Sequence, residues 1–191
     1  SDAILEIWQP GVNGALPMAG ILSGRINPSG KLAMTFPYST GQIPIYYNRR
    51  KSGRGHQGFY KDITSDPLYP FGHGLSYTEF KYGTVTPSVT KVKRGDRLSV
   101  EVTVTNVGAR DGAETVHWFI SDPYCSITRP VKELKHFEKQ LIRAGETKTF
   151  RFDIDLERDF GFVNEDGKRF LEAGEYHILV QGQTVKIELI D

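Results

Sequence analysis

Cysteine is nearly absent from this chain: Cys125 is the only one, so no intrachain disulfide can form and the redox compartment stays undetermined. No run of about eighteen apolar residues is present, and no signal peptide is recognisable at the start. Neither sign of charge is in excess, because 24 Lys and Arg face 23 Asp and Glu for a net charge of +1. Without a strong field of one sign, the chain is not expected to bind nucleic acid or a membrane.

Patterns of residues that hold metals or carry catalysis are also missing. Glu165 and Asp166 precede Gly167, which indicates a hairpin turn rather than a catalytic carboxylate pair. Cys125 has no Cys or His near it in sequence, which favours an inert thiol over a nucleophile. The residues alone therefore predict no catalytic residue, no metal site and no cofactor, and they leave substrate-binding residues unknown. The five histidines show no pairing at the spacing of metal ligands: His56, His73, His117, His136 and His177.

From about residue 80 onward, apolar and polar residues alternate as they do in half-buried strands. This repetition predicts a mainly β fold, a fibronectin type III or immunoglobulin-like β-sandwich. The alternating apolar positions are Leu98, Val100, Val102 and Val104; Val116, Trp118 and Ile120; Phe150, Phe152 and Ile154; Tyr176, Ile178 and Val180; and Val185, Ile187 and Leu189. Turn signals separate these runs at Asn106-Val107-Gly108, Ala144-Gly145-Glu146, Asp166-Gly167 and Ala173-Gly174.

Two aromatic residues in this region have specific expected places. Leu171 and Gly174 precede Tyr176 in the spacing of a tyrosine corner, in which the phenol hydrogen-bonds to nearby backbone. Trp118 occupies an inward position of the alternation, so we expect it in the core between the two sheets.

Residues 1–45 show a different pattern. Residues 3–8 form a nearly continuous apolar run, typical of a strand buried on both faces. A short helix is expected over Ala15–Leu22, with Gly24 as its stop, and a second strand over residues 31–36. This order predicts a partial βαβ unit from a truncated α/β domain, which needs further strands and helices to cover its apolar faces.

The chain between these two parts, residues 38–78, has no sustained periodicity and is expected to be a linker or wrapping loop. It contains the basic stretch Arg49, Arg50, Lys51, Arg54 and His56, which favours a solvated loop; a contact with a ligand or a missing neighbouring domain is the alternative. Further on, residues 129–139 mix charges with Val131, Leu134 and Phe137. We expect them to form an inter-strand segment that packs these three apolar side chains.

Several short motifs, taken together, resemble the C-terminal portion of glycoside hydrolase family 3, the large β-glucosidase and β-xylosidase group. No single motif is decisive, but they occur in the family's order over essentially the whole chain. They are Trp8-Gln9-Pro10-Gly11, Asn27-Pro28-Ser29-Gly30-Lys31-Leu32, Thr35-Phe36-Pro37, Ile43-Pro44 with Tyr46-Tyr47-Asn48, Tyr69-Pro70-Phe71-Gly72-His73-Gly74-Leu75-Ser76-Tyr77-Thr78, Ser121-Asp122-Pro123, Arg129-Pro130-Val131-Lys132-Glu133-Leu134 and Gly174-Glu175-Tyr176.

The resemblance implies a division into three parts: residues 1–45 as the remnant of the α/β sandwich domain, 46–78 as a linker, and 79–191 as a fibronectin type III-like domain. It also implies a parent enzyme that hydrolyses a β-glucoside or related oligosaccharide with retention, using two carboxyl groups about 5 Å apart. Both groups would lie in missing N-terminal catalytic domains, since no residue here matches their motifs. A periplasmic or secreted location is implied as well.

A different class of function stays open at this point. The chain is either a structural part of such an enzyme or a free-standing sandwich that binds polysaccharide or protein. The apolar runs of residues 1–45 favour the first reading, because an independent module has no use for them. Left without a partner, residues 1–45 either fold back onto the sandwich or bury their apolar side chains against a second copy of the chain. The second alternative, self-association through residues 1–45, is the one we expect, because the sandwich has its own core and no evident groove for a foreign strand.

Overall fold

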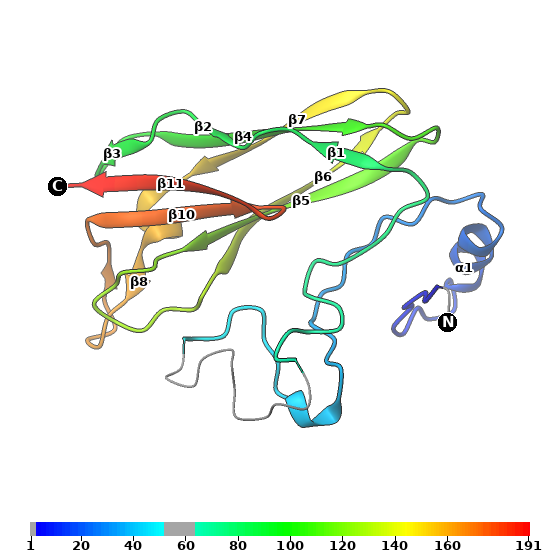
Figure 1. Ribbon diagram of the computed structural model, residues 1–191, viewed down its shortest axis with the longest axis horizontal. Coiled ribbons are helices and arrows are strands. Elements are labelled where there is room, and N and C mark those ends of the chain that lie inside the picture. The colour runs from blue at the N-terminus through cyan, green and yellow to red at the C-terminus, as the bar shows by residue number, and fades with distance from the viewer. Residues whose placement is uncertain (1–2, 52–63) are drawn as a thin grey trace.

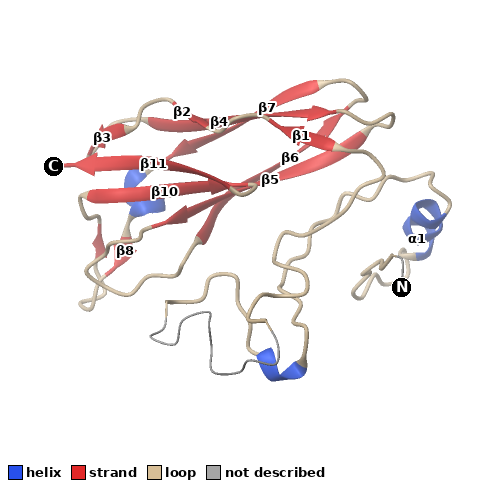
Figure 2. Cartoon of the chain, in the orientation of Figure 1, coloured by secondary structure: helices blue, strands red, loops and turns tan. Residues whose placement is uncertain are grey.

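The computed structural model describes residues 3–51 and 64–191 (Figure 1). Strands dominate it, and they gather in one two-layered body, from which the N-terminal segment and the linker extend to one side (Figure 2). None of the described helices is long and apolar enough to cross a membrane. The β-sandwich predicted from the alternation is confirmed.

The sandwich has a four-stranded and a five-stranded sheet. In the first, β4 (Leu98–Asn106) pairs with β7 (Thr147–Ile154) on one side and with β1 (Phe80–Tyr82) and β2 (Thr86–Pro87) on the other. The second has the order β3 (Lys91–Lys93), β11 (Gln183–Ile190), β10 (Gly174–Val180), β5 (Gly112–Ser121) and β6 (Glu133–Ile142). All its pairs are antiparallel except β11 with β3. One π-helical turn, η2 (Leu156–Phe160), leads into the small hairpin of β8 (Phe162–Val163) and β9 (Arg169–Phe170).

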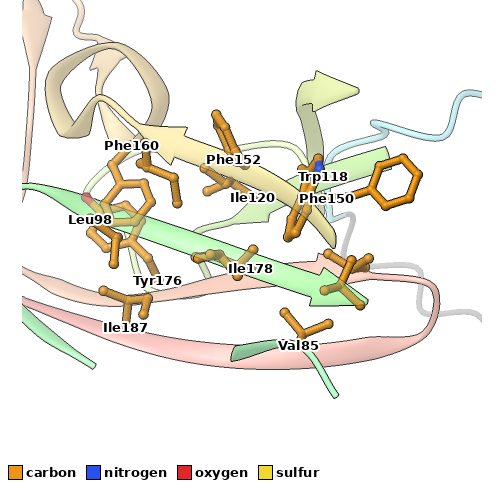
Figure 3. Close-up of a cluster of buried hydrophobic side chains, with 14 of the residues drawn as sticks. Val85, Leu98, Trp118, Ile120, Phe150, Phe152, Phe160, Tyr176, Ile178 and Ile187 are labelled. Carbon is orange, nitrogen blue, oxygen red and sulfur yellow. The ribbon is translucent and has the colours of Figure 1, made fainter. Parts of the chain in front are cut away.

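The core lies between the two sheets, where the alternating apolar side chains of both meet (Figure 3). Trp118 on β5 is 0% exposed and lies beside Phe152 of β7, with ring centroids 6.2 Å apart. The prediction that Trp118 is a core residue is therefore confirmed. A buried tryptophan offers no ring face on which a sugar could stack.

The tyrosine corner is formed as predicted. The Tyr176 hydroxyl donates to the backbone oxygen of Glu172 at 2.8 Å, and its ring stacks on Phe160 with centroids 4.2 Å apart. Leu171, at the start of this corner, is buried in the same core. The corner thus fixes the crossover that leads into β10.

The N-terminal part agrees with the sequence only in its helix. Helix α1 (Ala15–Leu22) has the predicted bounds, and Gly24 follows with φ +73°, a conformation that suits glycine. Residues 3–8 and 31–36, however, form no strand, apart from one bridge between Phe36 and Tyr69. A buried strand needs neighbours on both sides to pair with its backbone, and no strand in the described part of the chain pairs with these segments. Ile4 consequently stays 69% exposed.

Residues 129–139 also differ from expectation, because most of them belong to strand β6. Phe137 is 61% exposed, whereas it was expected to pack inside. It pairs with His117 of β5, on the outer face of the five-stranded sheet. The reason is that β6 lies at the edge of this sheet, where the polar His136 and Glu138 take inward positions and Phe137 between them faces outward.

Within residues 38–51 and 64–78, the described part of the segment expected to be a linker, the chain is irregular apart from the 3-10 turn η1 (Thr40–Gln42) and isolated bridges. Of its basic stretch, Arg54 and His56 lie outside the described residues. The side chains of Arg49, Arg50 and Lys51 are exposed, as expected for a solvated loop. The backbone is nevertheless anchored, because the Arg49 oxygen accepts from Val131 N at 2.8 Å and Arg50 forms a bridge with Pro130.

Candidate functional site

Asn27, the first residue of the Asn-Pro-Ser-Gly motif, ties three distant segments together. Its side-chain oxygen accepts hydrogen bonds from the Ser76 hydroxyl at 2.9 Å and from Tyr77 N at 2.8 Å. Its amide nitrogen donates to the backbone oxygen of Asp111 at 3.0 Å, just before β5. One side chain therefore fastens the N-terminal segment to both the end of the linker and the sandwich.

A buried ion pair lies next to these Asn27 hydrogen bonds. Lys31 Nζ is 3.1 Å from a carboxylate oxygen of Glu114 on β5, and both side chains are largely buried. The other Glu114 oxygen accepts from the Tyr82 hydroxyl at 2.8 Å, and Lys31 Nζ also donates to the Gly74 backbone oxygen at 3.1 Å. Burial, together with the Glu114 carboxylate, raises the pKa of Tyr82, so its hydroxyl stays a donor. We call Asn27, Lys31, Glu114 and Tyr82 the clamp.

Backbone pairing extends the clamp along the N-terminal segment. Leu32 N donates to the His73 oxygen and Gly72 N to the Leu32 oxygen, both at 2.8 Å. These two segments of the chain approach so closely at Gly74 that a Cβ there would lie 2.4 Å from the Gly30 backbone oxygen. Glycine is therefore the only residue that fits this crossing without a shift of the backbone.

An aromatic cluster covers the outer face of the five-stranded sheet beside the clamp. Tyr47 and Phe71 of the linker stack on each other with centroids 4.3 Å apart. Phe71 in turn meets the edges of His117 and Phe119 on β5, at 5.8 and 6.2 Å. These contacts hold the linker against the sandwich.

Between the linker and the sheet runs a groove of about 460 Å³, which we call the linker groove. His73 and His117 both line it, so the structure brings together two of the five histidines considered above. Lys132 lies at its wall, with Nζ 4.7 Å from the centroid of the Phe119 ring. Burial and the nearby Lys31 ammonium lower the pKa of His117, and burial lowers that of Lys132.

The other histidines lie apart. His136 stacks on Phe152 with centroids 4.9 Å apart, and a ring nitrogen of His177 lies 2.7 Å from a Glu175 oxygen. His56 is outside the described residues. Across residues 3–51 and 64–191, no group of three or more His, Cys, Asp or Glu side chains is placed to hold a metal.

Arg129 is the polar centre of the loop between β5 and β6. It is buried, and its guanidinium meets Asp122 at 3.1 Å, Glu133 at 2.8 Å and the Phe160 backbone oxygen at 2.6 Å. In the sequence this residue stands out only as part of the Arg129–Leu134 motif, since no local pattern shows that an arginine will be buried. The network uses its donors inside the protein, so it shapes the loop rather than a binding site.

Cys125 lies in the same loop, next to Glu172. Burial, with smaller effects from the Glu172 and Asp122 carboxylates, raises the pKa of Cys125 to about 11. A thiol that stays protonated near neutral pH is a poor nucleophile, which agrees with the inert role predicted for it.

Glu165 and Asp166 form a turn, as predicted. Asp166 N donates to the Asn164 side chain at 3.1 Å, and Gly167 has φ +76°. Both acids lie at the exposed tip of the β8–β9 hairpin. They do not converge on the linker groove or on the clamp.

Two known protein families match parts of this chain. The C-terminal domain of glycosyl hydrolase family 3 matches residues 1–77, and a fibronectin type III-like domain matches residues 114–184. The clamp joins these two regions, because Asn27 and Lys31 lie in the first and Glu114 in the second.

Named relatives of this chain include a β-glucosidase and a β-xylosidase. A periplasmic β-glucosidase of Salmonella typhimurium is 40% identical over 98% of this chain, and a β-xylosidase of Formosa agariphila is 38% identical over 93% of it. The chain spans only about a quarter of their length, 26% and 25%. Among solved structures, a β-glucosidase from Listeria innocua in complex with glucose superposes with a TM-score of 0.92 and 40% identity. The superposition covers 100% of this chain and 28% of the Listeria innocua chain.

Proposed function

Since the chain belongs to the C-terminal part of glycosyl hydrolase family 3, we propose that it is the structural C-terminal portion of a retaining, β-glucosidase-like enzyme. The whole enzyme would hydrolyse terminal β-linked sugars. In this proposal the nucleophile and the acid/base carboxyl groups, about 5 Å apart, are supplied by the missing N-terminal catalytic domains. The chain itself contributes no catalytic residue, metal or cofactor.

The clamp is the observation that carries this proposal. It joins the region that matches the family's C-terminal domain to the fibronectin type III-like sandwich through a buried ion pair and several hydrogen bonds. A buried charge pair requires a fixed geometry, because each charge depends on the other for compensation. The sandwich can therefore hold the preceding domain in one orientation.

The substrate class rests on the relatives. Their names include β-glucosidase and β-xylosidase, and a mutant of the Listeria innocua enzyme was solved with laminaribiose. We propose a β-glucoside or related oligosaccharide as the substrate here. The periplasmic relative supports a periplasmic or secreted location for the parent.

The domain division is also proposed: residues 1–45 as the end of the α/β domain, 46–78 as the linker and 79–191 as the sandwich module. The clamp supports it, because Asn27 and Lys31 contact both later parts. A free-standing carbohydrate-binding module is less well supported, since Trp118 lies in the core.

Activity measurements test the proposal. The chain alone and the full-length protein are incubated with an aryl β-glucoside and an aryl β-xyloside, and phenol release is followed. We expect turnover only in the full-length protein. Turnover by the chain alone that disappears on an Asp or Glu substitution within residues 1–191 would overturn the structural role.

A further inference from the structure

The linker groove has two walls that differ in origin. Residues 70–75 of the linker form one, and the outward side chains of β5 form the other, with the β10–β11 turn at one end. At about 460 Å³ its volume lies within the range of small-molecule sites, roughly 300–1,000 Å³. Phe71 and Phe119 make part of the lining apolar.

The charges around this groove are unbalanced. Among the described residues that line it, none is Asp or Glu, whereas Lys31 and Lys132 are both present. The Lys31 charge is already matched by Glu114, which lies behind the wall. Lys132 forms no ion pair with the described part of the chain, although it is partly buried. Its contact with the Phe119 ring stabilises an ammonium but does not neutralise it.

A partly desolvated cation without a counter-ion favours an anionic ligand. One ammonium matches one carboxylate, whereas phosphate groups are usually bound by several donors or by arginine. The Phe71 and Phe119 rings beside it offer contact to the carbon skeleton of an organic anion but add nothing for an inorganic one.

We propose that the linker groove binds a small organic carboxylate, with its carboxylate group at Lys132 Nζ and its carbon skeleton against Phe119 and Phe71. Sugar acids and simple aromatic acids share this chemistry. The proposal does not depend on the function proposed above.

An NMR titration of the 191-residue chain tests it. The probes are glucuronate and benzoate as carboxylates, glucose as the neutral counterpart of glucuronate, and inorganic phosphate. We expect saturable shifts for at least one carboxylate, located at Gly72, Gly182 and the Nζ resonance of Lys132, and weaker binding at higher salt.

Three variants isolate the charge. Lys132→Gln is expected to weaken carboxylate binding about tenfold or more, as loss of a charge-assisted hydrogen bond implies. Lys132→Arg keeps the charge and should retain most of the affinity. Lys139→Gln lies on strand β6, which begins directly after Lys132, and its side chain is exposed. It is the matched control and should bind like wild type.

The proposal is wrong if no carboxylate gives saturable shifts, if binding survives Lys132→Gln, or if glucose or phosphate binds as well as glucuronate. Binding of glucuronate alone would identify a sugar-acid site, and binding of both carboxylates a general one. Should Lys132→Gln fail to fold, the Lys132 Nζ resonance of the wild-type chain decides: it must shift in step with the groove amides.

Discussion

Lys31 Nζ and a carboxylate oxygen of Glu114 lie 3.1 Å apart, although one residue belongs to the N-terminal segment and the other to the middle of the sandwich. The pair is the buried centre of the clamp. Replacing Lys31 by Met leaves the Glu114 carboxylate buried with only the Tyr82 hydroxyl as a partner. Breaking a buried pair in this way costs about 3–5 kcal/mol, so we expect a large loss in the free energy of unfolding.

Urea denaturation of Lys31→Met measures this loss, and two further variants control it. Lys91 forms an ion pair with Glu188 at the same distance, 3.1 Å, but both side chains are exposed. Lys91→Met should therefore cost about 0–1 kcal/mol. Adding Glu114→Gln to Lys31→Met should recover part of the loss, since no buried charge then remains. Equal effects of Lys31→Met and Lys91→Met would contradict the role of burial.

Trp118 is the second residue whose removal should be costly. It is fully buried between the sheets, and its truncation leaves a cavity among Phe152 and the surrounding core side chains. Trp118→Ala should lower the free energy of unfolding by about 3–5 kcal/mol. Phe137→Ala, on an exposed aromatic of the neighbouring strand, should change it by less than about 0.5 kcal/mol. Melting curves of the two variants provide the measurement. A Trp118→Ala variant that melts at the same temperature as the wild type would show that the core is not closed.

Period-two alternation predicted β4, β5, β7, β10 and β11 correctly because each of these strands has one face in the core. Strand β6 was missed because its pattern is inverted. Antiparallel partners share a face, so His136 and Glu138, opposite Trp118 and Val116, point inward, while Phe137 points outward. At the edge of a sheet the inward positions reach solvent, which lets polar residues occupy them.

The clamp and the linker groove could not be predicted from sequence for a different reason. Their residues come from several segments that are far apart in the sequence, and no local pattern shows which lysine will meet which glutamate. The Asn-Pro-Ser-Gly-Lys motif was recognised as typical of the family, but its role as a tether to Glu114 became visible only in three dimensions. Lys132 likewise belongs to a motif that gives no sign that this lysine forms no ion pair with the described residues.

Cys125 should react slowly with thiol reagents in the folded chain. Burial keeps its pKa at about 11, so little thiolate is present near pH 8. We expect alkylation by iodoacetamide to accelerate at least about tenfold in urea, where the thiol regains its ordinary pKa of about 8.5. Cys125→Ser should leave melting nearly unchanged and serves as the blank. Alkylation of the folded chain at the rate of a free thiol would mean that the loop around Cys125 opens readily.

His117 should make the stability of the fold depend on pH. Burial and the Lys31 ammonium lower its pKa in the folded state, so the unfolded chain binds the proton more readily. Its contribution is therefore fully present above the ordinary histidine pKa of about 6.5 and is lost as pH falls below it.

Urea denaturation at about pH 7.5 and about pH 5.5, on either side of the ordinary histidine pKa, measures this contribution. The wild-type chain should lose more stability between the two values than His117→Gln does. His177→Gln is a suitable control, because His177 lies beside Glu175 and away from the linker groove. An equal loss in the wild type and in His117→Gln would exclude His117 as the responsible group.

The last prediction concerns the apolar side chains of the N-terminal segment. Val12 is 98% exposed and Leu16 of helix α1 76% exposed, and exposed apolar surface costs about 25 cal/mol per Å². Besides the clamp, the backbone oxygens of Ile21 and Gly24 accept from the Tyr77 hydroxyl and the Arg110 guanidinium, respectively. These attachments leave Val12 and Leu16 exposed, so folding back does not bury these side chains. We therefore expect the isolated chain to self-associate through residues 1–45, with a second copy as the cover.

Light scattering at micromolar concentration should report a dimer or a larger species. Leu16→Glu should shift it to monomer, because a charge cannot be buried in an apolar contact without a partner. Leu141→Glu, on another exposed leucine that lies on β6, is the matched control and should leave the association intact. A chain that is monomeric at every concentration contradicts this account, and dissociation by Leu141→Glu alone would move the contact to the outer face of the sandwich.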